Sequence, residues 1–347
     1  MPINYEVINP NTDVATTKTL LHEVIPLTGT IVSGTYGTFP NDDNIKNYSH
    51  GMFQSVYDYP YLSSSANHIF DISVGFDESS PLSGSTNAVQ EKKKINMYNQ
   101  FSQVMLGYTG SANRVRLFES DLQLDESAAD VMKEVVFVNL SRLLTKDQIK
   151  KGSMSLTVGT ASWADPFSGT KTFVDDEATN NGGTLNTAAG DYGILTGSDG
   201  VGGIVFYQAG VMVLTSSIWA GTTDFFSQSA TARTFDQQLV SGSISGSADA
   251  LRHRLQNLQF NNTTEINSSV YFCRASHNKF NYSSNPTYLS SSAIRVKNQN
   301  RDNPPVSYIT TIGLYNSQNE LLAVAKLSEP LKKDPTNELT LRVRLDY

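Results

Sequence analysis

The chain has 347 residues, a length that fits two domains or one large all-β domain and that is sufficient to bury a substantial core. Hydrophobic residues make up 39% of it and charged residues only 17%, with small polar residues in their place, which favours strands and turns over long solvated helices. The formal net charge of −7 argues against general nucleic-acid binding, because that activity requires a surface rich in lysine and arginine.

The first 160 residues are predicted to form a mixed β domain with a few helices. In residues 66–76 apolar and polar side chains alternate, which predicts a half-buried strand. Residues 86–108 carry apolar side chains at three- and four-residue spacing, which predicts a helix. A second, shorter helix is expected at residues 125–133, because Asp125 and Glu126 would lie at its positive N-terminal end.

Two further patterns in this part concern the ends of helices. The lysines at positions 92–94 head the first predicted helix and are expected on its solvated face. Thr145 followed by Gln148 matches a capping box, in which each side chain satisfies a free backbone N–H group. This pattern predicts a short helix that begins near Thr145 and ends at Gly152.

Residues 161–250 change in composition and form a second segment. They are rich in glycine, serine and threonine and nearly devoid of lysine and arginine. Residues 201–215 predict two strands that pivot at a central turn. The remaining stretches, including residues 180–183 and 241–247, lack apolar anchors and are expected to be turns or surface loops. The segment is therefore predicted to be a surface-exposed β region.

Residues 251–347 are predicted to form a C-terminal β-meander domain that packs on the N-terminal part. Residues 249–260 fit one amphipathic helix, and strands are expected at 306–315, 321–327 and 338–345. Because these strands are the most regular in the chain, we expect the meander to be the structural centre of the protein. The predicted fold is mainly β, with β-sandwich-type domains and a few short helices.

Cys273 has no cysteine partner in the chain and lies in an apolar, strand-like run, so we expect a small buried hydrophobic residue and not a nucleophile.

The expected cellular location follows from two negative observations. The start of the chain lacks the basic and apolar segments of a secretion signal. No stretch approaches the ~18 apolar residues of a membrane span. We expect a protein made in a cytoplasm, without membrane association.

The search for catalytic and metal-binding residues yields no candidate. Adjacent acids at positions 42–43, 77–78 and 175–177 would point to opposite faces of a strand. The third group has the residue types for Ca²⁺ but not the order of a calcium loop, so a solvated loop is expected. The five histidines lack metal-binding spacing and are expected to be surface or hydrogen-bonded residues: His22, His50, His68, His253 and His277. The sequence therefore predicts no catalytic residue, no metal and no cofactor.

The predicted C-terminal strands resemble segments of phage proteins. Residues 308–316 (YITTIGLYN) and 320–327 (ELLAVAKL) resemble a hairpin of tail, baseplate and fibre-attachment proteins of contractile-tailed phages, where fibre-attachment proteins carry it nearer the start. Residues 203–214 and 280–286 are similar to segments of structural proteins of large marine phages. The resemblance covers about a third of the chain. It implies a virion structural protein of the tail, baseplate or neck of a large contractile-tailed marine or T4-like bacteriophage.

The same hairpin supplies the candidate assembly residues. Glycine in its first strand lets a neighbouring backbone or ring approach closely. Its second strand, residues 321–327, is apolar on both faces, which suits a strand covered on both sides, within a sandwich or by the next subunit of a ring. The interface candidates are Thr310, Ile312, Gly313, Tyr315, Leu322 and Val324.

Three classes of function follow, each with its own structural signature. A non-enzymatic structural subunit of a tailed-phage virion, whose partners are other copies of itself and other virion proteins, should leave an apolar surface uncovered in the monomer. The alternative, a receptor- or glycan-binding module of the same particle, should place a Trp or Tyr platform beside Asp or Asn in an exposed groove. An enzyme, the least favoured class, should have a pocket with converging acids.

Overall fold

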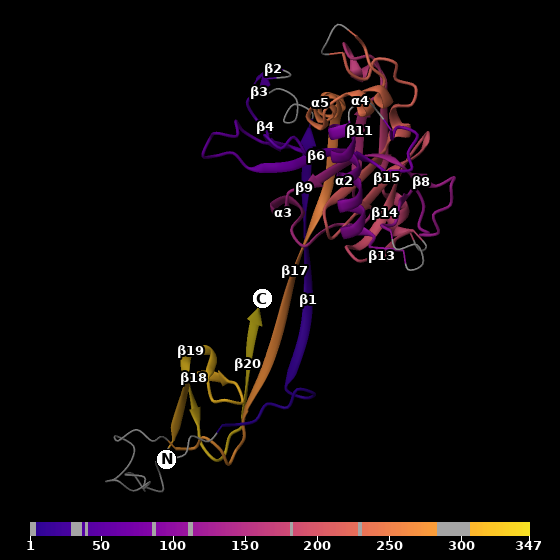
Figure 1. Ribbon diagram of the computed structural model, residues 1–347. Helices are drawn as coiled ribbons and strands as arrows, with labels where there is room; N and C mark the ends of the chain where they lie inside the picture. Colours follow the sequence, from indigo (N-terminus) through magenta and orange to yellow (C-terminus); the bar gives the residue numbers. More distant parts are fainter. Residues whose placement is uncertain are drawn as a thin grey trace. The chain divides into compact units, whose positions relative to one another are not determined.

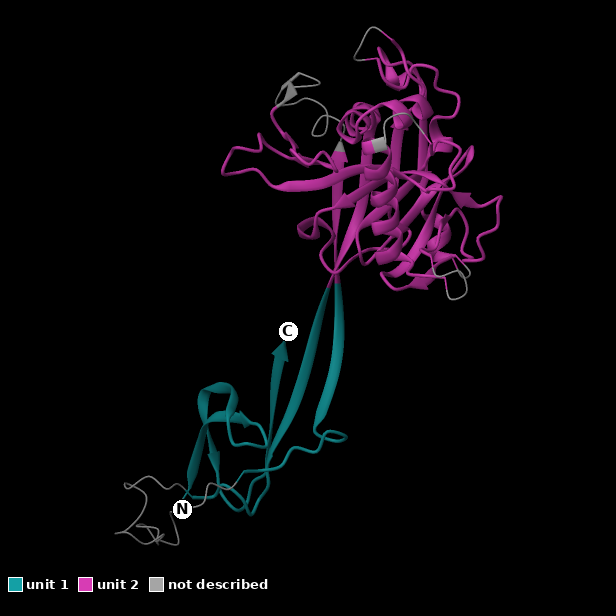
Figure 2. Cartoon of the chain, in the orientation of Figure 1, with its two compact units in different colours: residues 1–20, 265–347 teal, residues 21–264 magenta. Residues whose placement is uncertain are grey.

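The chain folds mainly as antiparallel β-sheet with few helices, as the sequence predicts. The structure is a computed structural model, which describes residues 5–28, 37–38, 41–84, 88–109, 114–180, 183–227, 231–282 and 306–347. The chain forms two compact units (Figure 2). Unit 1 comprises residues 1–20 and 265–347, and unit 2 comprises residues 21–264.

The elements of the described residues are labelled in chain order (Figure 1). The strands are β1 (Val14–Thr28), β2 (Gly37–Thr38), β3 (Asn41–Asp42), β4 (Ile45–Asn47), β5 (Gln54–Tyr57), β6 (His68–Phe76), β7 (Phe118–Glu119), β8 (Val131–Met132), β9 (Glu134–Leu140), β10 (Gln148–Ile149), β11 (Ser155–Gly159), β12 (Thr170–Val174), β13 (Leu185–Thr187), β14 (Gly190–Gly197), β15 (Gly200–Phe206), β16 (Val211–Thr215), β17 (Leu255–Ala275), β18 (Ser307–Tyr315), β19 (Leu321–Lys333) and β20 (Leu339–Asp346). The helices are α2 (Ala88–Met105), α3 (Arg142–Thr145), α4 (Phe235–Ser241), α5 (Ile244–Arg254), and the 3-10 turns η1 (Pro166–Ser168), η2 (Asp176–Thr179) and η3 (Ser216–Trp219).

Unit 2 is built on one antiparallel sheet that folds back on itself. Its strands follow the order β1-β17-β11-β12-β14-β15-β16-β9-β6-β5-β4, to which β1 contributes residues 21–28 and β17 residues 255–264 from this unit. Because successive side chains of a strand point to opposite faces, β6 places Phe70 and Ile72 on the inner face and Asp71 and Ser73 on the outer face. The strand predicted from this alternation is thus present, but most of its outer face is covered as well, so it is not the half-buried strand that the alternation predicts.

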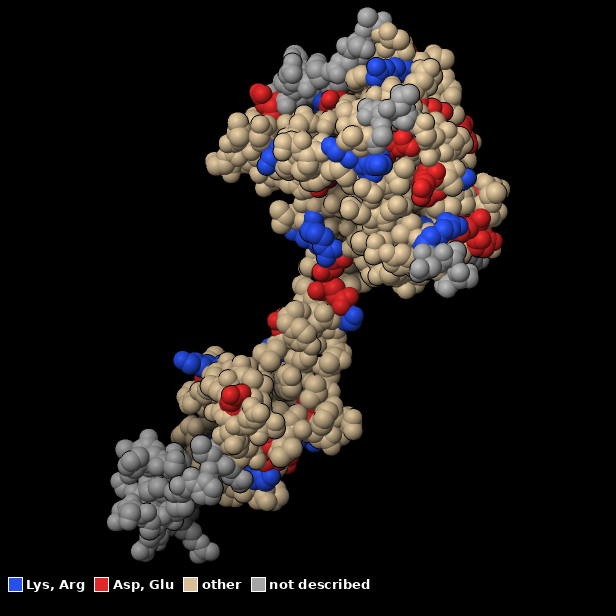
Figure 3. All heavy atoms as spheres, in the orientation of Figure 1, with Lys and Arg blue, Asp and Glu red and all other residues tan. Residues whose placement is uncertain are grey.

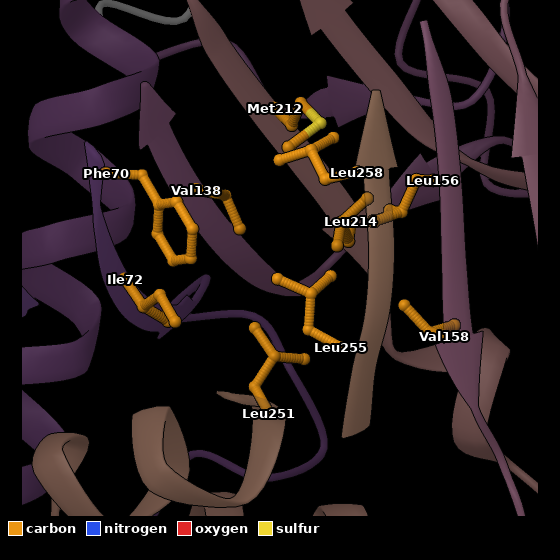
Figure 4. Close-up of a pocket in the computed structure, with 10 residues that line it drawn as sticks. All are labelled: Phe70, Ile72, Val138, Leu156, Val158, Met212, Leu214, Leu251, Leu255 and Leu258. Carbon is orange, nitrogen blue, oxygen red and sulfur yellow. The ribbon is translucent and has the colours of Figure 1, made fainter. Parts of the chain in front are cut away.

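The inner faces of the two halves of the sheet share one hydrophobic core (Figure 4). Ile72 and Val138 from β6 and β9 lie across from Leu156 and Val158 of β11, and Leu251 of α5 closes the end of the core. The cavity between these side chains has a volume of only about 10 Å³, roughly the space of one water molecule. The interior of the sheet is therefore filled by its own side chains and offers no room for a ligand.

The outer face of the sheet is covered by α2, which confirms the first predicted helix over residues 88–105. A second apolar cluster forms here, and it includes Tyr98 of α2 together with Phe118, Phe137 and Phe206. The rings of Tyr98 and Phe118 meet edge to face at 5.3 Å. Strands β6 and β9 are consequently buried on both faces.

Lys94, predicted to be solvated, is instead completely buried. Its ammonium group donates to the carbonyl oxygen of Leu239 and to that of Gly242, the latter at 2.7 Å, at the end of α4. Burial lowers the pKa of Lys94 to about 8. The sequence pattern fails here because the lysine donates to the free carbonyl groups at the C-terminal end of a second helix. The spacing of residues within the first helix cannot predict this contact.

Gly75 sets the distance between α2 and the sheet. A Cβ atom at this position would lie 2.9 Å from the carbonyl oxygen of Lys94, 2.9 Å from the backbone nitrogen of Tyr98 and 3.1 Å from the Phe137 ring. Two of these neighbours are backbone atoms of a helix, which cannot move independently. The absence of a side chain at Gly75 therefore permits the contact between α2 and β6.

We predict that Gly75→Ala lowers the free energy of unfolding by about 1–3 kcal/mol, because the added methyl group forces α2 away from β6. Gly221→Ala is the matched control, since a Cβ atom there meets no atom within 4 Å. Urea denaturation followed by circular dichroism measures both variants. Equal stability of Gly75→Ala and the parent chain would contradict this account of the contact.

The predicted helix at residues 125–133 is absent. The side chain of Asp125 accepts a hydrogen bond from the backbone N–H of Ser127 at 2.9 Å, and Glu126 has a φ of 58°. Both features belong to a turn, and the chain then enters β8. Asp125 stabilises the turn with the same side chain that would have capped a helix.

Two further predicted boundaries are shifted by helix caps. Residues 241–247, predicted as loop, span the end of α4 and the start of α5, because the side chain of Ser243 accepts from the backbone N–H of Gly246 at 3.0 Å. The helix predicted over residues 249–260 ends at Arg254, where β17 begins. Thr145, predicted to open a helix, is the last residue of α3.

The boundaries of the two compact units differ from those of the three predicted segments. Residues 160 and 250 both lie inside unit 2, because β9 pairs with β16 and β11 pairs with β17 in one sheet. The predicted surface exposure of residues 161–250 is wrong for β15 and β16, which are central strands. Every residue of β16 is buried, since both faces of this strand are covered.

Unit 1 contains two separate sets of paired strands. Residues 268–275 of β17 pair with β20, whereas β18 and β19 form a two-stranded sheet of their own, so the predicted meander is interrupted between β19 and β20. Its described residues bury only four apolar side chains: Val270, Ala275, Leu314 and Val343. Both large apolar clusters lie in unit 2. The prediction that the C-terminal strands are the structural centre is therefore wrong.

Candidate functional site

The β18–β19 hairpin of unit 1 carries all six predicted interface residues. Gly313 pairs with Val324, and Leu314 pairs with Ala323. The register shifts at two places. The first shift lies between Leu314 and Tyr315. At the second, Thr310 of β18 lies opposite four residues of β19, residues 327–330. The hairpin is therefore two short regular ladders separated by a bulge.

Most of the predicted interface residues are exposed on this hairpin. Leu322 is 68% exposed, Val324 51% and Tyr315 44%, while Ile312 is partly buried. Thr310 and Gly313 are exposed as well. The sequence indicated that residues 321–327 should be covered on both faces, and within the described part of the chain they are not.

Gly313 allows an aromatic ring to lie over the strand. A Cβ atom at Gly313 would lie 2.8 Å from the ring of Tyr315 and 3.1 Å from the side chain of Leu321. The ring of Tyr5 packs against that of Tyr315 with a centroid distance of 4.8 Å. The sequence pattern missed Tyr5, because it lies more than 300 positions before its partner in the chain.

These residues together form an exposed apolar patch, which we call the hairpin surface. On the face drawn in Figure 3, most of the described surface of unit 1 is uncharged. The loop at the tip is held by Asn316, whose side chain accepts from the backbone N–H groups of Gln318 and Glu320, each at 2.9 Å. The hairpin surface consists of Tyr5, Gly313, Tyr315, Leu321, Leu322 and Val324.

The polar cluster on β5 and β6 of unit 2 does not form a catalytic triad. The hydroxyl of Ser55 donates to Oδ1 of Asp71 at 2.5 Å, and Nε2 of His68 lies 2.8 Å from the same oxygen. In a triad the histidine must contact the nucleophile, with the carboxylate behind it. Here serine and histidine compete for one carboxylate, so neither is activated by the other.

In the acidic group at residues 175–177, Asp175 is structural, in contrast to the predicted solvated loop, whereas Asp176 and Glu177 are exposed as predicted. Asp175 is completely buried and accepts hydrogen bonds from the backbone N–H groups of Gly152 and Met154, at 2.8 and 2.7 Å, and from the hydroxyl of Tyr207 at 3.1 Å. Burial raises the pKa of this carboxyl, and the three donors oppose the rise. Its oxygens are therefore occupied by the fold.

In the part of the chain that the structure describes, no group of three or more histidine, cysteine or acidic side chains is placed to hold a metal ion. The side chains of His22, His50, His68 and His253 are hydrogen-bonded, as in the contact of His253 Nε2 with the carbonyl oxygen of Trp163 at 3.0 Å. Cys273 is partly buried on β17, and burial, followed by the charge of Asp13, raises the pKa of its thiol. A raised pKa disfavours the thiolate that a nucleophile requires.

Glu119 is the most unusual acid in unit 2. It is 1% exposed, and neither of its carboxylate oxygens has a hydrogen-bond partner among the described residues. Burial, together with the charges of Asp121 and Asp125, raises its pKa to about 7. The ionised form of Glu119 is therefore disfavoured in the folded state.

We predict that Glu119→Gln stabilises the chain at pH 8 and that the gain shrinks as the pH falls toward 4.5. The folded pKa of about 7 exceeds the unfolded value of 4.5, so the folded state binds the proton more tightly and its stability falls as the pH rises through this window. Chemical denaturation between pH 5 and pH 8 measures the effect, with the exposed Glu78→Gln as control. A gain that does not change with pH would contradict this prediction.

Comparison with protein-family models, with curated proteins and with solved structures found no match. Among the described helices, none has the length and apolar character needed to cross a membrane. The candidate site therefore stands on its own geometry: an exposed apolar hairpin in a unit that buries few apolar side chains.

Proposed function

We propose that this chain is a non-enzymatic structural subunit that associates with other copies of itself, and with other proteins of a tailed-phage virion, through the hairpin surface. The observation that carries the proposal is the exposure of Tyr315, Leu321, Leu322 and Val324 on one hairpin. Contiguous exposed apolar side chains are typical of protein–protein interaction sites.

The small core of unit 1 supports the same proposal. Burial of apolar surface is the main source of folding free energy, at about 25 cal/mol per Å². With four buried apolar side chains among its described residues, unit 1 draws little of this stabilisation from its own packing. Covering the hairpin surface with a neighbouring subunit would supply the missing burial.

The virion assignment rests on the sequence resemblance of the hairpin, residues 308–316 and 320–327, to tail, baseplate and fibre-attachment proteins. We place the chain in the tail, baseplate or neck of the particle, after synthesis in the cytoplasm of a bacterial host. The net charge of −7 favours protein partners over nucleic acid.

We predict that the double variant Leu322→Ser with Val324→Ser weakens self-association by about tenfold or more per substitution, because each buried aliphatic side chain contributes roughly 1.5–3 kcal/mol. Sedimentation velocity over a range of concentrations measures the oligomeric state. The matched control is Leu62→Ser with Leu143→Ser, since these leucines of unit 2 are also exposed, at 86% and 66%. A monomeric parent chain at all concentrations, or an equal loss in the control, would overturn the role of the hairpin.

The virion assignment has its own test. We expect the chain to be detected by mass spectrometry in density-purified particles of the phage that encodes it, in multiple copies per particle, because a symmetric assembly repeats its subunits. Immunogold labelling would then locate it at the tail, baseplate or neck. Its absence from purified particles would reject the virion role, whatever the result with the hairpin variants.

A further inference from the structure

A groove of about 340 Å³ opens on the outer face of the sheet in unit 2, beside α2. One wall is a stripe of α2 that includes Met97, Phe101 and Val104, spaced by three and four residues along one face of the helix. Phe53 lines the groove as well, and the strands β6 and β9 contribute the remaining residues. The volume lies within the range of small-molecule sites, about 300–1,000 Å³.

The strand residues of the groove pair a carboxylate with an amide. Asp71 lies directly opposite Asn139 in the β6–β9 ladder, so both side chains point to the same face. Oδ1 of Asp71 is occupied by Ser55 and His68, whereas Oδ2 has no donor among the described residues. The amide of Asn139 likewise makes no hydrogen bond within the described part of the chain. Oδ2 of Asp71, an acceptor, and the amide of Asn139, which can donate and accept, therefore lie side by side without a hydrogen-bond partner in the described part of the chain.

The aromatic residues of the groove are held in place from behind. The ring of Phe101 stacks on that of Phe137 with centroids 4.1 Å apart and an interplanar angle of 10°. Phe53 packs against Tyr48 at 4.7 Å and against His50 at 5.0 Å. The apolar sides of the groove are therefore preformed, which reduces the cost of binding.

From this lining we propose that the groove binds a neutral saccharide ring. Among the described residues, no lysine or arginine lines the groove, which disfavours phosphates and carboxylates as ligands. A sugar matches both parts of the lining: its C–H face packs against aromatic rings, whose faces carry negative charge density, and its adjacent hydroxyls pair with a carboxylate and an amide. The site lies wholly within unit 2 and does not depend on the assembly proposed for the hairpin surface.

The test uses saturation-transfer difference NMR on the full chain. The probes are the methyl glycosides of glucose, galactose, mannose and N-acetylglucosamine, with acetyl-Gly-Lys-Gly-amide as a cationic peptide for comparison. We expect one or more glycosides to bind with a Kd on the order of 1–10 mM, as expected for so few non-hydrogen atoms. The peptide should give no signal that responds to changes in the groove.

Two variants of α2 identify the site. Val104 is 64% exposed at the groove, and Val104→Arg places a long side chain across it, which should weaken glycoside binding at least tenfold. Val89→Arg is the control, because Val89 is 66% exposed on the same helix and does not line the groove. Asn139→Ala should also weaken binding by loss of the amide.

Three results would overturn the proposal: no binding of any glycoside probe, binding unchanged by Val104→Arg, or preferential binding of the lysine peptide. The last would assign the groove to a protein segment. Since Val104 is largely exposed, its substitution leaves folding intact, and thermal melting of both arginine variants verifies this.

Discussion

The fold of unit 2 depends on burying strands β6, β9 and β16 on both faces. These strands are apolar on alternate and often on adjacent positions, so a sheet with one solvated face would leave many of their side chains in water. The sheet meets this requirement on the inner side by folding back, so that β11 and β17 cover the core. On the outer side α2 provides the cover, and Gly75 permits its close approach.

Two of the completely buried cations of unit 2 connect elements that surround the sheet. Lys94 joins α2 to the carbonyl groups at the end of α4. The guanidinium of Arg254 is also completely buried and donates to the backbone carbonyl oxygens of Ala161 at 2.7 Å and Asp224 at 2.6 Å. A buried cation without acceptors is costly, so each of these side chains favours the one arrangement in which the carbonyl groups converge on it.

Local patterns predicted the elements better than the way in which they combine. The alternation of apolar and polar residues predicted β6, and apolar residues at helical spacing predicted α2, because both patterns depend on residues that are close in the chain. The errors arose where a side chain had two local roles: Asp125 stabilises a turn where a helix cap was expected, and Ser243 caps α5 within a stretch that resembles a loop. No local pattern could place Asp71 beside Asn139, since this pairing depends on the register of two strands far apart in the chain. The six interface candidates could be proposed together because they lie on adjacent strands, whereas Tyr5, which packs on Tyr315, is too distant in the chain for any local pattern to include it.

The bulge in β19 limits how the edge of this exposed apolar hairpin can pair with other chains. An exposed strand edge offers a continuous row of N–H and C=O groups, and identical chains can extend it without limit into fibrils. In β19 the four residues opposite Thr310 break that row, and Pro330 among them has no N–H to offer. Open-ended growth along the edge is thereby hindered, while the side chains on the hairpin face remain free to pack. The association proposed for the hairpin surface would therefore form by side-chain packing and not by backbone pairing along this edge.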